Sequence, residues 1–258
     1  MVENIIKKIK AADLVLIGIG EALDMFDRIE KEEDYQKAAM KPDEAESTWM
    51  FPFLKKIVAQ RMESDKLRIY EPLSDCIKEK NYFVVSLCQD GLLGKSGLDK
   101  NRIVEPCGSH ERLQCSKKCC MELHPVPEGL LEQVRSFWCG HESDRPKEPL
   151  CPRRGSALVF NNVNAADYVE EGYLEGWMRY KKWLQGTVNK KLCVLELGVG
   201  MRYPTVVRWP FEKIVFYNQK AELFRVHEKL YQVPEEIRDR AHGISQKPEE
   251  FLTELYAK

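Results

Sequence analysis

Apolar runs of strand length alternate along the chain with stretches of helical periodicity. Leu14–Gly20 is an apolar run that ends in a Gly-x-Gly turn, and Asn81–Leu87, Lys191–Gly198 and Lys213–Tyr217 are three further predicted strands. Predicted helices cover Asn4–Lys10, Trp49–Val58, Glu71–Lys80, Tyr168–Leu184, Ala221–Leu230 and Pro248–Tyr256. Strands that alternate with helices in this way indicate an α/β fold with a mostly parallel sheet.

The stretch between Cys115 and Cys151 breaks this pattern. It contains scattered prolines and one predicted helix, Glu128–Phe137, and it holds five of the nine cysteines, namely Cys115, Cys119, Cys120, Cys139 and Cys151. We therefore predict a Rossmann-type domain formed by residues 1–111 and 158–258, with a small cysteine-containing, zinc-ribbon-like module inserted at residues 112–157.

Charge and hydropathy narrow the classes of partner. Lysine and arginine number 40 against 41 aspartates and glutamates, so we expect neither a nucleic-acid nor a membrane partner. No apolar run approaches the roughly 20 residues that a bilayer span needs. The first residues, MVENIIKKIKAADLV, are amphipathic and lack the apolar core of a signal peptide, and we expect a cytoplasmic protein. Clustered cysteines in that setting indicate a metal before a disulfide.

The order of the later motifs resembles the sirtuins. NYFVVSL is followed by CQD, EPCGSHERLQC, the clustered cysteines, CPRRG, LELGVG and VFYN, whereas sirtuin chains run GAG, Asn-x-Asp, His-Gly, two cysteine pairs, a late Gly-rich turn and an Asn. QCSKKC, VEEGYLEGWMRYKKWL and LELGVGMRYPTVVRWPF are most similar to the macrodomain-linked bacterial sirtuins called class M. The resemblance covers Ala11 to Leu255 and thins over Asp24–Thr48, where the family has a longer stretch that closes over NAD.

The resemblance implies an NAD or ADP-ribose site at the two glycine turns. Glycines let a backbone approach a pyrophosphate. The expected cofactor-binding residues are Gly18, Gly20, Gln89, Asp90, Gly198, Gly200 and Asn218. In sirtuins the Asn matched here to Asn218 contacts the adenosine ribose; the alternative is a helix cap before Ala221. Glu21 and Asp24 are acidic residues in the first turn, and each opposes a diphosphate by about 1 kcal/mol if solvated at about 4 Å.

The expected catalytic residues are Cys107, Asp90 and Cys88. Cys88-Gln89-Asp90 stands at the Asn-x-Asp position, and Cys107-Gly108 stands where sirtuins carry the His-Gly base of deacetylation. A thiol with a reference pKa near 8.5 is a poor base. Cys107 is then either a nucleophile with a lowered pKa or a replacement in a site without catalysis. His110 is a second candidate base, or a solvated loop residue.

The resemblance also implies a structural zinc site. Cys115 and Cys119 match the first cysteine pair, and Cys151 matches the first member of the second pair. Arg154 stands at the fourth position and cannot ligate zinc, so Cys139 is the predicted fourth ligand. Behind Cys139 we consider Cys120, His124 and His141. The alternative is a module that holds no metal and is stabilised by its own packing.

These expectations combine into a divergent sirtuin-like protein that binds NAD or ADP-ribose. If active, it transfers ADP-ribose or cleaves NAD, with weak or no lysine deacetylation, on a protein substrate or partner. Two alternatives stay open, a non-catalytic sensor of NAD or ADP-ribose and a pseudoenzyme that binds no nucleotide.

Overall fold

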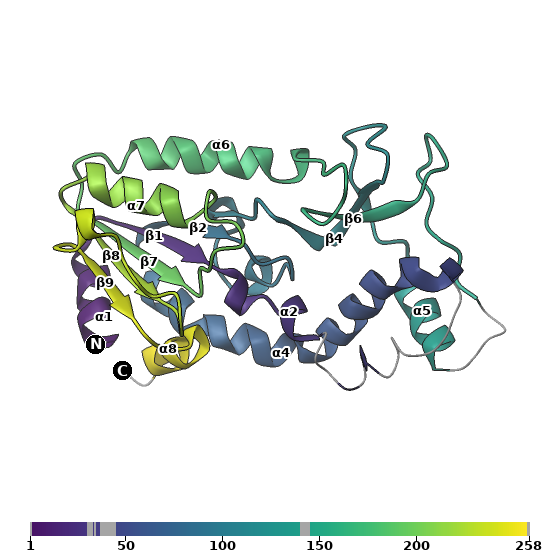
Figure 1. Ribbon diagram of the computed structural model, residues 1–258, viewed down its shortest axis with the longest axis horizontal. Coiled ribbons are helices and arrows are strands. Elements are labelled where there is room, and N and C mark those ends of the chain that lie inside the picture. Colours follow the sequence, from purple (N-terminus) through teal and green to yellow (C-terminus); the bar gives the residue numbers. More distant parts are fainter. Residues whose placement is uncertain (1, 30–32, 34, 37–44, 140–144, 257–258) are drawn as a thin grey trace.

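A six-stranded parallel sheet forms the larger part of the protein (Figure 1). The computed structural model describes residues 2–29, 33, 35–36, 45–139 and 145–256. The strands lie in the order β3-β2-β1-β7-β8-β9, and each neighbouring pair is parallel. Their bounds are β1 Leu14–Ile19, β2 Asn81–Ser86, β3 Ile103–Val104, β7 Leu192–Leu197, β8 Ala221–Val226 and β9 Ala241–Ile244. The predicted α/β class with a parallel sheet is confirmed.

The central strands are buried on both faces. All six residues of β1 and of β7 are buried, as expected for parallel strands covered by helices on both sides. Leu14 is level with Leu192 of β7, which is level with Ala221 of β8. The carboxyl ends of the three strands therefore meet at one edge of the sheet, directly before both glycine turns.

Helices cover both faces of the large sheet (Figure 1). One core contains apolar side chains of α1, α4 and α8, and the other contains those of α6 and α7. Their bounds are α1 Val2–Ala11, α4 Phe51–Ile77, α6 Glu171–Gln185, α7 Arg208–Tyr217 and α8 Pro248–Tyr256. None of the helices in the described part of the chain is long and apolar enough to cross a membrane.

Two neighbouring predictions were wrong in opposite senses. Lys213–Tyr217, predicted as a strand, is the second half of α7, whose buried Phe211 and Val215 recur at helical spacing. Ala221–Leu230, predicted as a helix, begins with β8. A short apolar run does not by itself distinguish a strand from a buried helix segment. A buried ion pair with Glu196 accommodates the charged Arg225 inside the sheet.

A three-stranded antiparallel sheet forms the smaller part. Its order is β5-β4-β6, with β4 Gly108–Cys115, β5 His124–Pro125 and β6 Leu158–Asn162. It packs against α5 (Leu130–Trp138) and the first half of α4, which runs beneath both parts of the molecule in Figure 1. The sheet thus begins before residue 112 and ends after residue 157, and the domain boundaries themselves stay a prediction.

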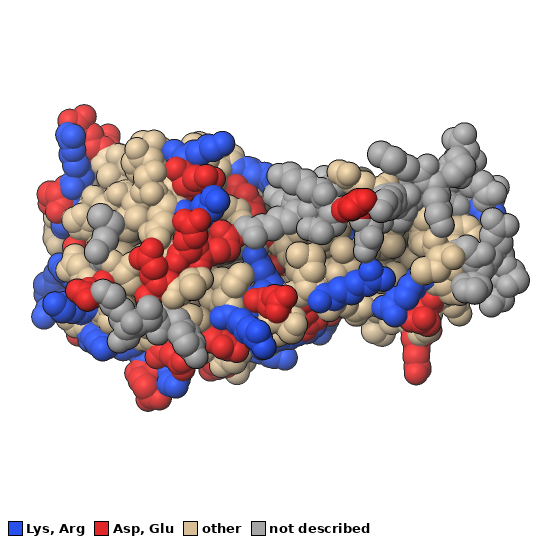
Figure 2. Space-filling view, turned by 90° about the horizontal axis from the view of Figure 1, so that it is seen from below, with Lys and Arg blue, Asp and Glu red and all other residues tan. Residues whose placement is uncertain are grey.

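The surface in Figure 2 carries mixed charge. Lysine and arginine side chains are interspersed with aspartate and glutamate, and among the described residues they form no continuous basic patch on this face. Helix α2 covers Phe26–Ile29, and the short helix η2 covers Ala45–Met50. Within Asp24–Thr48, where the resemblance to the family thins, residues 30–32, 34 and 37–44 lie outside the described residues.

Candidate functional site

The two glycine turns contact each other at the carboxyl edge of the large sheet. A Cβ added to Gly20 would fall 2.0 Å from the carbonyl oxygen of Gly198, so only glycine allows this approach. Gly198 itself has a φ of +68°, which favours glycine. A Cβ on Gly18 would fall 2.6 Å from Cγ1 of Val207. The structure therefore brings Gly18, Gly20, Gly198 and Gly200 together, and all four make room for protein atoms.

A carboxylate occupies the backbone donors of the second turn. The N–H of Gly200 donates to Oε2 of Glu21 at 3.2 Å, and the N–H of Arg202 donates to Oε1 at 3.1 Å. Successive N–H groups that point at one anion form an anion-binding concavity. Glu21, which the sequence marked as unfavourable for a diphosphate, thus accepts both of these N–H groups itself.

A buried network of ion pairs lies next to the second glycine turn. Arg225 and Glu196 are both inaccessible to solvent, and Nε of Arg225 lies 2.5 Å from Oε2 of Glu196. Nη2 of Arg225 also lies 2.8 Å from Oε1 of Glu212. Arg208 donates to the carbonyl oxygen of Val199 at 3.3 Å, inside the turn itself. Of these charged groups, Arg208 bonds directly to the backbone of the second turn.

His227 is a residue of this edge that sequence reasoning missed. It directly follows β8, and its Nδ1 accepts hydrogen bonds from the N–H groups of Lys229 and Leu230, each at 3.0 Å. Burial lowers the pKa of His227, while the nearby charge of Glu21 acts in the opposite direction. A sequence signal for it exists in the opposite charges of Glu196 and Arg225. Their pairing places β7 and β8 side by side, and His227 directly follows β8.

Asn218 lies at the opposite edge of the sheet. It follows α7 and precedes β8, so the length of a strand, roughly 20 Å for six residues, separates it from the glycine turns. Its Nδ2 donates to the carbonyl oxygens of Thr187 and Lys190 at 3.0 and 3.1 Å, and its Oδ1 accepts from the N–H of Lys220. The structure therefore does not bring Asn218 to the glycine turns, because the predicted strand before it is the second half of α7.

Two aspartates connect the loops that follow β1 and β2. Oδ2 of Asp24 accepts the N–H of Gln89 at 2.8 Å, and Oδ2 of Asp90 accepts the N–H of Met25 at 3.2 Å. The other oxygen of Asp90 accepts the N–H of Leu92 at 3.1 Å. Burial raises the pKa of Asp90, although these N–H groups oppose the rise. Asp90 lies at the predicted edge, and both of its oxygens bind backbone.

The two candidate catalytic cysteines are buried thiols. Cys88 is fully buried and donates to the carbonyl oxygen of Gly20 at 3.4 Å, and burial raises its pKa well above the usual range. Cys107 is 1% exposed, and burial, with the charges of Glu21 and Asp24, raises its pKa to about 12. A nucleophilic thiolate needs the opposite shift, so the structure does not support the nucleophile interpretation of Cys107.

His110 is part of the core. Its ring stacks on Phe26 with centroids 3.9 Å apart and packs at 4.8 Å against Phe160. Its Nδ1 lies 3.2 Å from the carbonyl oxygen of Gln89. Burial lowers its pKa to about 4. His110 is therefore neither a base tuned to neutral pH nor a solvated loop residue.

Glu105 is a second ionisable residue that the sequence did not single out. Its Oε1 is buried and has no hydrogen-bond partner among the described residues. Burial, and then the charges of Asp90 and Glu111, raise its pKa to about 8. It precedes Cys107 by two residues, and its pKa is close to the optimum for a group that exchanges a proton near neutral pH.

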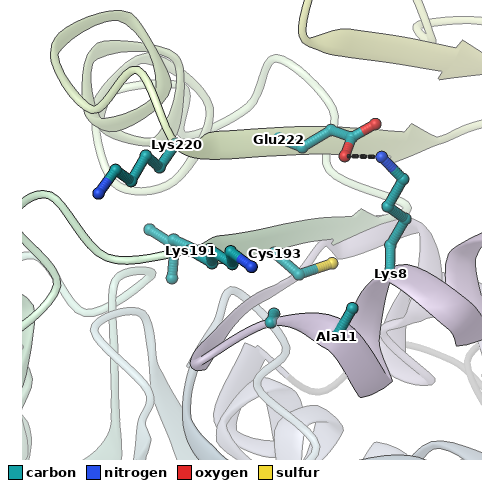
Figure 3. Close-up of a pocket in the computed structure, with 8 residues that line it drawn as sticks. Lys8, Ala11, Lys191, Cys193, Lys220 and Glu222 are labelled. Atoms are coloured by element: carbon teal, nitrogen blue, oxygen red, sulfur yellow. Dashed lines mark hydrogen bonds and ion pairs between the residues drawn. The ribbon is translucent and has the colours of Figure 1, made fainter.

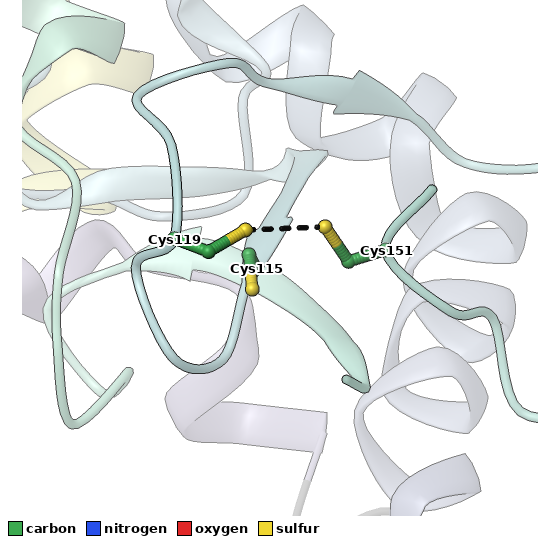
Figure 4. A group of neighbouring side chains, drawn as sticks. All are labelled: Cys115, Cys119 and Cys151. Atoms are coloured by element: carbon green, nitrogen blue, oxygen red, sulfur yellow. Dashed lines mark hydrogen bonds between the residues drawn. The ribbon is translucent and has the colours of Figure 1, made fainter. Parts of the chain in front are cut away.

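Three cysteines converge in the smaller part of the protein (Figure 4). The Sγ atoms of Cys115, Cys119 and Cys151 lie within 4.8 Å of one another, and those of Cys119 and Cys151 are 3.4 Å apart. Burial raises the pKa of Cys115, but the N–H groups of Cys119 and Lys117 outweigh it and lower the pKa to about 7. Hydrogen bonds with Cys115 and Cys151 raise the pKa of Cys119 to about 12.

The predicted fourth ligand is not part of this group. Cys139 is exposed after the end of α5 and belongs to neither potential metal group among the described residues, while His141 lies outside them. Cys120 and His124 form a second group that shares Cys151. Nε2 of His124 is buried and has no hydrogen-bond partner in the described part of the chain. These residues fit the donor set of a zinc ion.

A cavity of about 230 Å³ lies at the amino edge of the large sheet (Figure 3). Lys8, Lys191, Lys220 and the buried Cys193 line it, and Nζ of Lys8 lies 2.6 Å from Glu222. The strands separate this cavity from the glycine turns, so it is no part of the candidate site.

Two curated proteins resemble the chain in sequence. It is 32% identical over 151 residues to a probable bifunctional ADP-ribose hydrolase/ADP-ribosyltransferase of Fusarium oxysporum f. sp. cubense, covering 56% of this chain and 25% of that protein. It is 23% identical over 190 residues to a protein ADP-ribosyltransferase of Staphylococcus aureus, covering 71% of this chain and 59% of that protein. The chain thus spans about a quarter and about three fifths of these relatives. No family model matches the chain.

Solved sirtuin structures share the fold. A Sir2 protein bound to an acetylated peptide superposes with a TM-score of 0.58 at 15% identity, covering 100% of this chain and 98% of that one. A mutant Sir2 homologue in complex with ADP-ribose gives 0.53 at 14% identity, covering 100% and 96%. The resemblance to sirtuins predicted from the motifs is confirmed for the fold of the whole chain.

Proposed function

We propose that the chain binds NAD or ADP-ribose at the carboxyl edge of its parallel sheet. The observation that carries the proposal is the carboxylate held by the N–H groups of Gly200 and Arg202, because a site that binds one anion has the donors to bind a phosphate group. The position agrees with the rule that open α/β sheets bind ligands beyond the carboxyl ends of their strands. The named activities of the two curated relatives and the ADP-ribose complex of a structural neighbour support this ligand class.

For chemistry, we propose ADP-ribosyl transfer to a protein, or NAD cleavage, with little or no lysine deacetylation. Nicotinamide would leave the ribose carbon, and Glu105, in its ionised form, would accept a proton from the attacking nucleophile. Its buried carboxyl would have to reach that nucleophile once NAD is bound. Asp90 would act as a positioning residue, since it joins the loops that bear Met25 and Gln89.

A non-catalytic sensor is the second candidate, and one observation favours it. The side chains at the expected catalytic positions, Cys88 and Cys107, are buried thiols with raised pKa values, and both oxygens of Asp90 bind backbone. Such a protein would still bind ADP-ribose, since the backbone donors of the second turn are unaffected.

Calorimetric titration with NAD and with ADP-ribose tests the binding proposal. Saturable binding of either ligand at one site per chain supports it, and no binding of either at millimolar concentration contradicts it. An assay for nicotinamide release then separates the two candidates, because an enzyme releases nicotinamide from NAD and a sensor does not. Robust turnover on an acetylated peptide would contradict the expected weak deacetylation.

We also propose one structural zinc ion on Cys115, Cys119, Cys151 and His124. His124 replaces the predicted Cys139, because its Nε2 is buried without a described partner whereas Cys139 is exposed. A zinc ion would connect the turn after β4 to the segment before β6. Metal analysis should find about one zinc per chain, lost in Cys151→Ser and His124→Ala and retained in Cys139→Ser. Retention in His124→Ala with loss in Cys120→Ser would assign the fourth position to Cys120.

A further inference from the structure

The N–H groups of Gly200 and Arg202 form an anion cradle, and the carboxylate of Glu21 occupies it. A Cβ added to Gly200 would fall 2.6 Å from Oε1 of Glu21, so the missing side chain at position 200 is what gives the carboxylate room. Each carboxylate oxygen accepts one N–H, from Gly200 and from Arg202. Hydrogen bonds to an ionised acceptor are stronger than neutral ones, and Glu21 is thus an anion bound in its own protein.

The short helix that carries Glu21, η1 (Glu21–Leu23), is fixed at its other end. Leu23 is fully buried, and the next residue, Asp24, accepts the N–H of Gln89 at 2.8 Å. Glu21 is half-buried, Arg202 is exposed and Gly200 is buried. Both hydrogen bonds are made by the side chain of Glu21, so rotation of that side chain vacates both donors.

The negative charge of Glu21 also affects other ionisable side chains at the carboxyl edge of the sheet. It contributes to the raised pKa of Cys107, whereas Arg202 acts against that rise. It also acts on His227 and on Arg208, raising the pKa of each against the effect of burial. Removal of this one negative charge therefore leaves the edge with a more positive potential.

We propose that Glu21 is an internal competitor for anionic ligands of this site. A phosphate group binds the N–H groups of Gly200 and Arg202 only after the carboxylate of Glu21 has left them. The inference rests on the proposed function and adds the residue that sets affinity and selects ligands by charge. Adenosine, which carries no phosphate, has no need to displace Glu21 and is insensitive to it.

Calorimetric titration of the wild type, Glu21→Gln and Glu21→Ala with ADP-ribose, inorganic diphosphate and adenosine tests this proposal. Both variants should bind ADP-ribose and diphosphate at least tenfold more tightly than the wild type, while their affinity for adenosine changes less than about twofold; tenfold corresponds to about 1.4 kcal/mol. Glu175→Gln on α6 is the control, because it removes the same charge from an exposed ion pair with Arg179. Thermal unfolding checks that each variant is folded, and the Gln variant keeps the shape of the side chain if the Ala variant does not fold.

The outcomes separate this inference from the function on which it rests. If both Glu21 variants bind ADP-ribose no more tightly than the wild type, Glu21 is a structural clamp and the inference is overturned, whereas the proposed function stands. If no variant binds ADP-ribose, the proposed function is overturned, and the diphosphate titration alone decides the inference. Equal tightening in Glu175→Gln would also overturn it, because the effect would then be one of net charge.

Discussion

The two halves of the carboxyl edge use buried polar groups in opposite ways. At the β7–β8 half, formed by Glu196, Gly198–Gly200, Arg225 and His227, buried charges pair with each other and leave backbone N–H groups directed at an anion. At the β1–β2 half, the side chains satisfy the protein's own backbone or lie in the core. The members of this second half are Asp24, Cys88, Gln89, Asp90, Cys107 and His110.

The contrast indicates that the proposed binding and the proposed chemistry depend on different halves of one sheet. A backbone cradle survives changes of side chain, provided that the charges behind it keep the turn in place. A catalytic constellation depends on side chains that stay accessible, polar and correctly ionised. Burial of Cys88, Cys107 and His110 removes those properties from the β1–β2 half, while Glu105 keeps a pKa near neutrality.

The largest effect is expected from breaking the charge network behind the cradle. Glu196→Gln leaves Arg225 buried with less compensation, and loss of one partner of a buried pair typically costs about 3–5 kcal/mol. Urea denaturation should therefore show a free energy of unfolding lower by that amount than in the wild type. Glu175→Gln, in an exposed pair, should lose less than about 1 kcal/mol. Similar losses in both variants would show that the network does not stabilise the β7–β8 half.

The second prediction concerns thiol reactivity at the β1–β2 half. The pKa of Cys107 is raised from 9.0 to about 12, which lowers its thiolate fraction by about 10³ near pH 8, and burial slows it further. Alkylation with iodoacetamide, followed by mass spectrometry, should label the exposed Cys139 at least about 10³ times faster than Cys107. Labelling of Cys107 at a comparable rate would restore it as a nucleophile and remove the contrast between the halves.

The third prediction uses pH. The pKa of Glu105 is raised from 4.5 to about 8 in the folded protein, so its contribution to stability is present below pH 4.5 and is lost as the pH rises toward 8, by up to about 1.4 kcal/mol per pH unit. Glu105→Gln does not titrate. Its free energy of unfolding relative to the wild type should therefore increase between pH 5 and pH 8. A constant difference over this range would show that Glu105 is ionised in the fold.

The smallest effects compare two residues at opposite ends of β8. Asn218→Ala should leave the affinity for ADP-ribose unchanged within about twofold, and should lower stability by about 1 kcal/mol through lost hydrogen bonds. His227→Ala releases the N–H groups of Lys229 and Leu230 beside the cradle, and should weaken ADP-ribose binding about fivefold, or about 1 kcal/mol. Calorimetric titration of both variants with ADP-ribose measures these affinities. A greater loss of affinity in Asn218→Ala than in His227→Ala would contradict the placement of the site.

Much of the fold follows from local pattern. The apolar runs of β1, β2 and β7 are strands, as their length and the turn residues that follow them predicted. The two Gly-x-Gly sequences and the spacing of Cys115, Cys119 and Cys151 likewise predicted groups that the structure brings together. These features are encoded by residues that are close in sequence, or by residue types with few alternative roles.

Tertiary contacts decided what local pattern left ambiguous. β8 is a strand, and not a helix, and its Arg225 pairs with Glu196 of the neighbouring strand. Asn218 precedes β8 and therefore lies at the edge opposite the glycine turns. Glu21 reaches Gly200 across 179 positions of sequence, and Asp24 reaches Gln89 across 65. Local pattern thus accounts for the α/β class with its parallel sheet, the glycine turns and the cysteine trio. Which polar groups bind other parts of the protein follows only from the folded chain, because their partners lie far away along the sequence.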